Sequence, residues 1–366
     1  MNEASRLRAL RRAMSAQQIE ALLITHLPDV RYLCGFTGSN AALAVTARKA
    51  VVFTDGRYTA QAHEETKAAR VSIPEHPHTA LGEACALLES SIPKKTRAFY
   101  DPAHTTVSAL AAMRAALSPG RRRGFFGPLK QPLVSELRMV KDPDELDRVV
   151  AAAALGNHLF HAILPHVQPG IPEAEIAASL EFFARSMGAE AMSFETIVAS
   201  GPRSALPHGR ATSRKTPRNG FVTLDFGVIL KGYCSDMTRT VCIGKAGRSE
   251  RSAYDAVLEA QQAAVAAVRP GVTCGEVDEA ARSVLRKAGL DEYFTHSTGH
   301  GVGLEIHEPP RIAREQKQEL KPGMVVTIEP GVYMPARFGI RIEDMVVVTE
   351  KGPKVLTPVT KALVEL

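Results

Sequence analysis

Val222-Thr-Leu-Asp-Phe-Gly227 is an apolar segment that carries one carboxylate near its end. Later in the chain the same pattern returns as Val326-Thr-Ile-Glu-Pro-Gly331. Short apolar runs rich in β-branched residues and ended by glycine predict buried strands. Aspartate and glutamate are depleted in strands, so an acidic residue at the same place in both segments is unusual. These two segments are the starting point for predicting both fold and site.

The segments before these two strands also repeat. Pro169-Gly-Ile-Pro-Glu-Ala-Glu-Ile176 precedes a predicted helix ending at Met187-Gly188, and Pro270-Gly-Val-Thr-Cys-Gly-Glu-Val277 precedes one ending at Ala288-Gly289. Each copy follows the order helix, helix, strand, with a carboxylate near the end of the strand. The shared order predicts a duplicated half-domain. Two such halves facing each other would bring the two strand carboxylates together at the centre.

The first part of the chain has a different pattern, in which strand segments alternate with helical ones, as in an α/β domain. Pro119–Gly124 and Gly127-Pro128 interrupt this pattern, and we interpret them as a linker. A new helix opens at Asp142-Pro-Asp-Glu145, with Asp142 as N-cap, proline at the first helical position and Glu145 completing a capping box. The sequence thus predicts two domains, residues 1–134 and 135–366.

The composition argues against a membrane-spanning protein and against a nucleic-acid-binding protein. The chain has 366 residues and a net charge of +6, without an apolar run long enough to cross a bilayer. We interpret Arg121-Arg-Arg123 as a solvated inter-domain loop, because neither a basic helix nor a nucleic-acid motif accompanies it. The five cysteines form no CxxC pair, which favours a reduced compartment. We expect a cytoplasmic protein that binds neither nucleic acid nor membrane.

Four carboxylates stand in strands of the second domain. After a tight turn the chain returns through Asp236, which would lie directly or diagonally across from Asp225 on the same face. Glu329 ends a further strand, and Glu343 lies in another, two residues after Arg341. Taken singly, these residues could be surface aspartates on a solvated hairpin and a neighbouring ion pair. Together they fit one site better than four unrelated positions.

A glycine-rich stretch, Thr295-His-Ser-Thr-Gly-His-Gly-Val-Gly-Leu-Glu-Ile-His-Glu-Pro-Pro310, adds three histidines. His296 and His300 stand four apart, which is the spacing of a zinc-binding helix. Three alternate glycines would each cost such a helix about 0.8–1 kcal/mol relative to alanine. We therefore predict an extended or looped backbone that passes close to the site.

Four carboxylates carry four negative charges, which two divalent cations would neutralise. Oxygen-rich ligation with a single imidazole suits manganese better than a thiolate zinc site, with cobalt or zinc as alternatives. Two metals about 3.5–4 Å apart can lower the pKa of a bridging water and polarise a carbonyl. The residues thus predict metal-assisted hydrolysis by an activated hydroxide.

The order and local context of Asp225, Asp236, His300, Glu329 and Glu343 resemble those of the dinuclear metallopeptidases with the pita-bread fold: methionine aminopeptidase, prolidase and aminopeptidase P. The resemblance implies an α+β catalytic domain with pseudo-two-fold symmetry. It implies that Asp225 chelates one metal and that Asp236 and Glu343 bridge both. His300 and Glu329 would bind the other metal, and Glu329 would also accept a proton from the attacking water.

Ser200-Gly-Pro-Arg-Ser-Ala-Leu-Pro-His-Gly209 and the spacing of the three histidines resemble the proline-specific branch of this family. There, residues matching His208, His296 and His307 line the substrate site, with His307 near the scissile carbonyl. Arg341 would contact the bridging glutamate. The substrates implied are peptides with proline in second position, whose tertiary amide offers no N–H to an ordinary peptidase.

The first domain resembles the creatinase-type domain of the same branch, through Val30-Arg-Tyr-Leu-Cys-Gly-Phe-Thr-Gly-Ser-Asn40 and Phe53-Thr-Asp-Gly-Arg-Tyr58, and relatives with this domain are commonly homodimers. The short chain and the stretches Phe36-Thr-Gly-Ser-Asn40 and Thr54-Asp-Gly-Arg57 resemble small bacterial aminopeptidases P, which favours an Xaa-Pro aminopeptidase. The alternative is an Xaa-Pro dipeptidase (prolidase), which must reject longer peptides with a loop or a basic side chain that the sequence alone does not place. Creatinase, which works without metal, and non-catalytic peptide-binding relatives are remote alternatives, because both have lost ligands that this chain retains.

Overall fold

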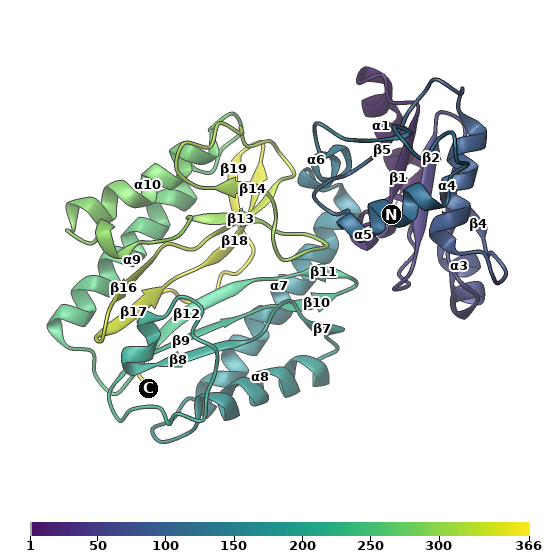
Figure 1. The fold of residues 1–366 in the computed structure, drawn as a ribbon. Coiled ribbons are helices and arrows are strands. Elements are labelled where there is room, and N and C mark those ends of the chain that lie inside the picture. Colours follow the sequence, from purple (N-terminus) through teal and green to yellow (C-terminus); the bar gives the residue numbers. More distant parts are fainter. Residues whose placement is uncertain (1) are drawn as a thin grey trace. The chain divides into compact units, whose positions relative to one another are not determined.

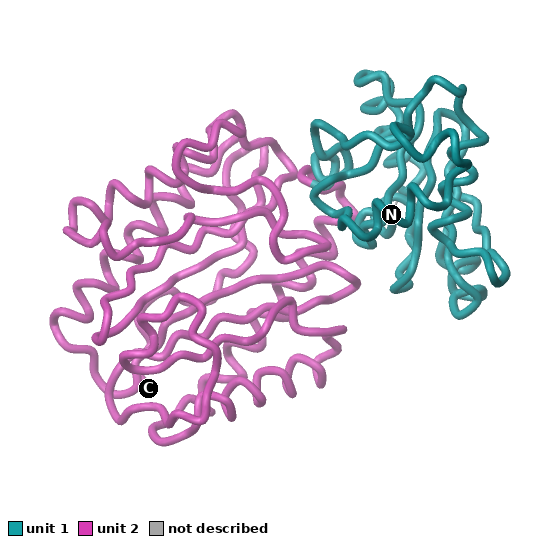
Figure 2. The backbone as a smooth tube through the Cα atoms, viewed as in Figure 1, with its two compact units in different colours: residues 1–138 teal, residues 139–366 magenta. Residues whose placement is uncertain are grey.

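The computed structural model describes residues 2–366 and divides into two compact units, residues 1–138 and 139–366 (Figure 2). The division falls at the end of α6 (Leu133–Met139), so the boundary expected at residue 134 lies near the start of this helix. None of the helices within residues 2–366 combines the length and apolar character that a membrane span requires.

Unit 1 is an α/β unit built on one mixed sheet with the strand order β4-β3-β2-β1-β5-β6 (Figure 1). β2 and β3 form an antiparallel hairpin, and β1 pairs antiparallel with β2 and parallel with β5, so the sheet combines a hairpin with longer crossover connections. The strands are β1 (Ala21–Ile24), β2 (Ala42–Thr46), β3 (Ala50–Phe53), β4 (Arg70–Ser72), β5 (Ala98–Tyr100) and β6 (Phe126–Pro128). The helices before α6 are α1 (Glu3–Ala16), α2 (Leu27–Cys34), α3 (Thr59–Glu65), α4 (Ala80–Ser91) and α5 (Val107–Ala115).

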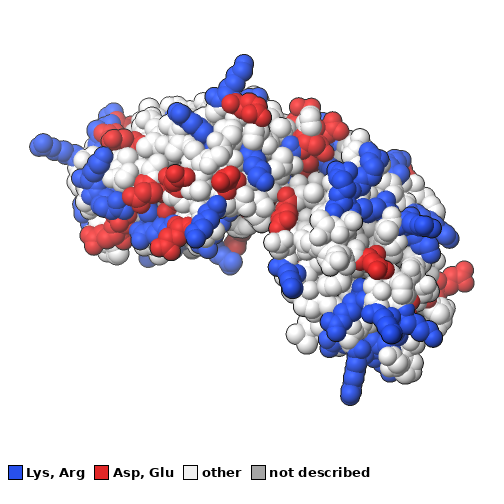
Figure 3. Space-filling view, turned by 90° about the horizontal axis from the view of Figure 1, so that it is seen from above, with Lys and Arg blue, Asp and Glu red and all other residues white. Residues whose placement is uncertain are grey.

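The segment interpreted as a linker belongs to unit 1, so that prediction is wrong. Gly127 and Pro128 lie in β6, which pairs parallel with β5 at the edge of the sheet. An edge strand tolerates proline because one row of its backbone groups faces away from the sheet. Arg121-Arg-Arg123 lies in the connection from α5 to β6, with the Arg121 guanidinium 4.5 Å from the centre of the Phe125 ring. Figure 3 shows where lysine and arginine reach the surface on one face of the molecule.

Unit 2 contains two halves that each place two helices against a sheet (Figure 1). In the first half the apolar faces of two helices pack on a sheet of order β12-β9-β8, and in the second half another pair packs on a sheet of order β14-β13-β15-β18-β19. The first half consists of α7 (Pro143–Ile163), α8 (Glu173–Ser186), β7 (Ala191–Met192), β8 (Ile197–Ser200), β9 (Gly220–Phe226), β10 (Val228–Leu230), β11 (Tyr233–Cys234) and β12 (Met237–Ile243). The second consists of α9 (Arg248–Ala267), α10 (Cys274–Lys287), β13 (Gly299–Gly301), β14 (Glu308–Ile312), β15 (Val325–Ile328), β16 (Gly331–Met334), β17 (Phe338–Arg341), β18 (Asp344–Thr349) and β19 (Gly352–Val355).

Local sequence signals explain where these elements begin and end. Asp142 caps α7 in a capping box with Glu145, as predicted. α8 and α10 end just before Gly188 and Gly289, whose φ angles of +94° and +70° lie in the left-handed region that favours glycine after a helix. The predicted repeat of helix, helix and strand is therefore present in the fold.

Candidate metal centre and substrate cavity

The hairpin of the first half brings two aspartates to one face. Asp225 in β9 is paired directly with Thr238 of β12, so Asp236, two residues before Thr238, is its diagonal neighbour. Of the two arrangements expected from the sequence, the structure has the diagonal one. Both aspartates are buried, and both line one cavity of about 980 Å³.

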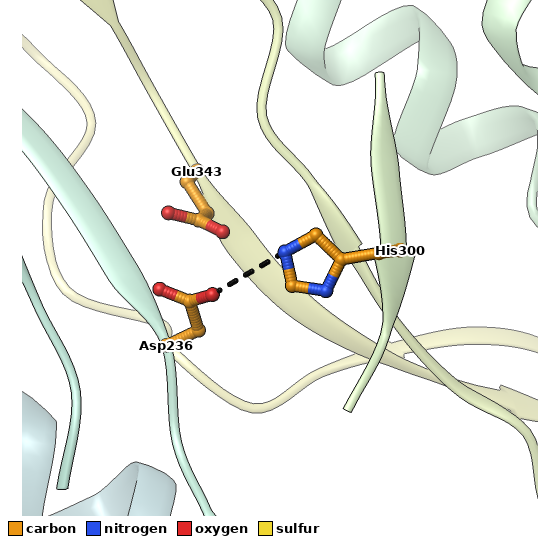
Figure 4. A group of neighbouring side chains, drawn as sticks. All are labelled: Asp236, His300 and Glu343. Atoms are coloured by element: carbon orange, nitrogen blue, oxygen red, sulfur yellow. Dashed lines mark ion pairs between the residues drawn. The ribbon is translucent and has the colours of Figure 1, made fainter. Parts of the chain in front are cut away.

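The second half supplies the facing side chains. His300 lies in β13, Glu329 follows β15, and Glu343 lies between β17 and β18. His300 Nε2 is 3.6 Å from Asp236 Oδ2 and 3.4 Å from Glu329 Oε1. Asp236, His300 and Glu343 each offer a ligand atom, and these atoms lie within 4.8 Å of one another (Figure 4). The five side chains that the sequence singled out therefore line one cavity.

The tautomer of His300 follows from its hydrogen bonds. Nδ1 is 3.0 Å from the carbonyl oxygen of Gly301, and a carbonyl can only accept, so Nδ1 carries the proton. Nε2 then presents its lone pair to the carboxylates. Burial lowers the pKa of His300 to about 4, which keeps the ring neutral. A neutral imidazole with a fixed tautomer is the form that binds metal ions.

The carboxylates are in an environment that disfavours four negative charges. Burial and the neighbouring Glu343 raise the pKa of Asp236 well above its usual range, and burial and Glu329 do the same for Glu343. Burial raises the pKa of Glu329 to about 8. Within residues 2–366, the buried atoms Asp225 Oδ1 and Glu343 Oε1 accept no hydrogen bond. Such unsatisfied acceptors around a cavity are suited to cations.

The glycines of the histidine stretch have a packing role. His300 lies in a strand, so the predicted extended backbone is confirmed. A Cβ on Gly299 would lie 1.9 Å from the carbonyl oxygen of Thr327, and one on Gly301 would lie 2.3 Å from that of Pro309. The backbone around His300 thus passes close to its neighbouring strands and does so only with glycine at these positions.

Arg341 contacts a different carboxylate from the one expected. Its Nη2 donates to Asp225 Oδ2 at 2.5 Å, in a pair that joins the two halves. It reaches Glu343 only through Thr238, whose hydroxyl accepts from Arg341 Nε at 3.1 Å and donates to Glu343 Oε2 at 2.6 Å. The sequence shows that Arg341 and Glu343 are two residues apart, but it does not show that Asp225 of another strand lies nearer to Arg341 than Glu343 does.

His208, His296 and His307 all line the cavity. His307 packs edge-to-face on His300, with ring centres 4.4 Å apart. His296 Nδ1 lies 2.8 Å from the carbonyl oxygen of Ser297 and must donate to it, which leaves Nε2 to accept from the Tyr333 hydroxyl at 2.8 Å. Burial lowers the pKa of His296 to about 4, so this ring is also neutral.

Tyr333 was not identified from the sequence. Its hydroxyl lies between His296 and Arg341, accepting from Arg341 Nη1 at 2.7 Å. Tyr333 stands in β16, opposite Gly339 of β17, in a hairpin that carries Arg341 at its far end. No local motif marks this tyrosine, and only the pairing of the two strands reveals its place.

Comparisons with known proteins agree with this geometry. The profile of "Metallopeptidase family M24" matches residues 147–350, and that of the "Creatinase/Prolidase N-terminal domain" matches residues 6–140. The Xaa-Pro dipeptidase of Pyrococcus horikoshii is 32% identical over 96% of both chains. A solved Xaa-Pro dipeptidase from Bacillus anthracis superposes over 100% of both chains with a TM-score of 0.94 and 37% identity. A solved X-Pro aminopeptidase from Thermotoga maritima has a TM-score of 0.86 and 34% identity over 98% of this chain and 99% of its own. The expected fold, a creatinase-like domain followed by a pita-bread catalytic domain, is confirmed.

Proposed function

The chain belongs to metallopeptidase family M24, and we propose that it hydrolyses the bond before proline in Xaa-Pro dipeptides. The observation that carries the proposal is the close group of Asp236, His300 and Glu343 in a cavity lined by three further histidines. The sequence alone favoured an aminopeptidase over a dipeptidase. Two of the three relatives described above bear the name Xaa-Pro dipeptidase, which supports the dipeptidase instead.

Two divalent cations fit the residues present. Asp225, Asp236, His300, Glu329 and Glu343 would hold them, through the unsatisfied carboxylate oxygens and the free Nε2 of His300. Manganese suits this oxygen-rich set, with cobalt or zinc as alternatives. When bound, such a pair of metals supplies an acidified water and polarises the scissile carbonyl.

The protein side chains divide the remaining tasks. Glu329 lines the cavity beside His300 and would take the proton from the attacking water. His307, packed on His300, would lie near the scissile carbonyl and stabilise charge that develops on its oxygen. His296, held by Tyr333, and His208 would line the space that the proline ring and the first residue occupy.

Arg311 is the side chain that would select dipeptides. It lines the cavity and is the direct cross-strand partner of His300, so both project from the same face of β13 and β14. Two other arginines that line the cavity have partners: Arg341 is bonded to Asp225, and Arg210 is paired with Glu195. Within residues 2–366 the Arg311 side chain has no ion pair or hydrogen bond. Its guanidinium would donate hydrogen bonds to the carboxylate of a C-terminal proline, which a longer peptide lacks at this position.

The test compares Ala-Pro with Ala-Pro-Ala, each at saturating manganese, in the wild type and in Arg311→Gln. We expect the wild type to prefer the dipeptide and Arg311→Gln to raise KM for Ala-Pro by about 10-fold or more, the value of one charge-assisted hydrogen bond. KM for the tripeptide should hardly change. Arg210→Gln is the matched control, since it removes a cavity arginine that already has a partner.

An Xaa-Pro aminopeptidase is the second candidate. The cavity volume of about 980 Å³ leaves room beyond a dipeptide, and the Thermotoga maritima relative is an X-Pro aminopeptidase. Faster turnover of Ala-Pro-Ala than of Ala-Pro by the wild type would favour this candidate. An equal rise in KM for both peptides in Arg311→Gln would show that Arg311 does not bind the carboxylate of the dipeptide.

A further inference from the structure

Each half of unit 2 contains a buried carboxylate on a helix that does not line the cavity. Glu173 is the first residue of α8, and Asp278 lies in the second turn of α10. Both side chains are fully buried. Each one is hydrogen-bonded to the loop that carries one cavity histidine, His208 in the first half and His296 in the second.

Glu173 joins the two ends of the His208 loop, residues 200–212. Its Oε1 accepts from the backbone N–H of Ser200 at 2.8 Å and from the Ser200 hydroxyl at 2.9 Å. Its Oε2 accepts from the Thr212 hydroxyl at 2.8 Å, from the Thr212 N–H at 3.2 Å and from Arg203 Nε at 3.1 Å. One carboxylate thus closes the loop at both ends and pairs with an arginine inside it.

Asp278 holds the His296 loop, residues 294–298, in a related way. Its Oδ1 accepts from the Thr298 hydroxyl at 2.8 Å and from the Thr298 N–H at 3.2 Å. Its Oδ2 accepts from Arg282 Nε at 2.7 Å, and Arg282 in turn donates to the backbone carbonyls of Phe294 and His296. The Arg282 guanidinium also lies 4.2 Å from the centre of the Phe294 ring, against which His296 packs.

In both carboxylates, each of the two oxygens accepts at least one hydrogen bond. A buried carboxylate is costly unless hydrogen bonds satisfy it, and here the donors come mainly from one loop in each half. Loops otherwise move more than the helices and strands they connect. Because a misplacement of about 1 Å can reduce turnover about 100-fold, a fixed loop matters most where it carries a group that meets substrate.

We propose that Glu173 and Asp278 are positioning residues, each of which sets the place of one cavity histidine. Glu173 positions His208, and Asp278, with Arg282, positions His296. Each half of the unit then places one of the two histidines through its own buried carboxylate. This inference rests on the proposed function in one respect, namely that these histidines meet the substrate.

Double-mutant cycles separate positioning from a general effect on stability. Glu173→Gln keeps the shape of the side chain but turns an N–H towards the loop donors. We expect it to lower kcat for Ala-Pro by about 10-fold in the wild type and by less than about 2-fold in a His208→Ala background, because the histidine it positions is gone. In a His296→Ala background the full loss should remain. Asp278→Asn should show the reverse pattern.

A readout independent of turnover completes the test. Hydrogen exchange of the amides in residues 201–211 should rise in Glu173→Gln, and that of residues 294–298 should rise in Asp278→Asn, with bound metal unchanged in both. Should either variant fail to fold, Thr212→Val or Thr298→Val removes a single hydroxyl donor from the same carboxylate.

The proposal would be overturned if each carboxylate variant lowered kcat by the same factor in all backgrounds. Unchanged hydrogen exchange in both loops would also overturn it. Failure of the wild type to cleave Ala-Pro would instead count against the proposed function, while the exchange measurement would still decide whether the carboxylates hold the loops.

Discussion

The two halves of unit 2 share a fold but contribute different chemistry. The first half supplies Asp225, Asp236 and His208 to the cavity, together with Arg210 and Glu195, which pair with each other. The second half supplies three histidines and three glutamates, together with Arg311 and Arg341. Asp225 lies near the end of β9, and Glu329 directly follows the equivalent strand β15, so duplication explains why carboxylates face each other. The glycine-rich histidine stretch, which has no counterpart in the first half, makes the site asymmetric.

Fold symmetry and site symmetry are therefore separable. A symmetric pair of strands can bind two cations between its carboxylates. A peptide has two chemically different ends, so the residues that bind it must be arranged asymmetrically. We therefore expect variants in the shared carboxylates to abolish metal binding, and variants in the histidines to change turnover while metal remains bound.

The largest effect is expected from Asp236→Ala. Asp236 is buried between the two halves and belongs to the closest group of candidate ligands. Losing a residue that merely contacts a metal ligand costs about 10–100-fold in affinity or activity, so losing a proposed ligand itself should cost more. Metal analysis of the purified variant and its turnover of Ala-Pro measure both consequences. A variant with full metal content and normal turnover would refute the assignment of Asp236.

A smaller effect, and a contrast between the halves, is expected from the cavity histidines. His307 packs on His300, whereas His208 lies in a loop of the other half. His307→Ala should lower kcat by about 100-fold and His208→Ala by about 10-fold, within the range for removing one polar group from an active site. Metal content should be normal in both. Loss of metal in His208→Ala would place this histidine among the ligands.

The sequence was sufficient to predict the features that depend on local pattern. The capping box at Asp142, the strands around Asp225 and Glu329 and the extended backbone at His300 all follow from residues close together in the chain. The repeat also allowed the pairing of the two halves to be predicted. A duplicated motif implies that its two copies face each other, whereas a single strand does not indicate its distant partners.

Features that depend on long-range pairing escaped sequence analysis. Pro119–Gly124 has the composition of a linker, yet the strand after it completes the sheet of unit 1. Arg341 stands beside Glu343 in the chain but binds Asp225 of the other half. Glu173 and Asp278 look like ordinary helical acids until the loops they hold are seen. In each case the contact joins residues that lie far apart in the chain, and neither hydrophobic periodicity nor a motif relates one to the other.

The smallest expected effect concerns the stability of the metal-free protein between pH 6.5 and 8. Burial raises the pKa of Glu329 to about 8, and those of Asp236 and Glu343 also rise, so the folded metal-free state holds protons that the unfolded state releases. Stability must then fall as pH rises through this window. The lowered pKa of His300, about 4 against 6.5 when unfolded, acts in the opposite direction but only below pH 6.5. Thermal unfolding of the metal-free protein should therefore show a Tm that falls by a few degrees from pH 6.5 to 8, and manganese should cancel the fall because it favours the ionised carboxylates. A Tm that does not fall over this window without metal would mean that the protein itself already stabilises the ionised carboxylates of the two halves.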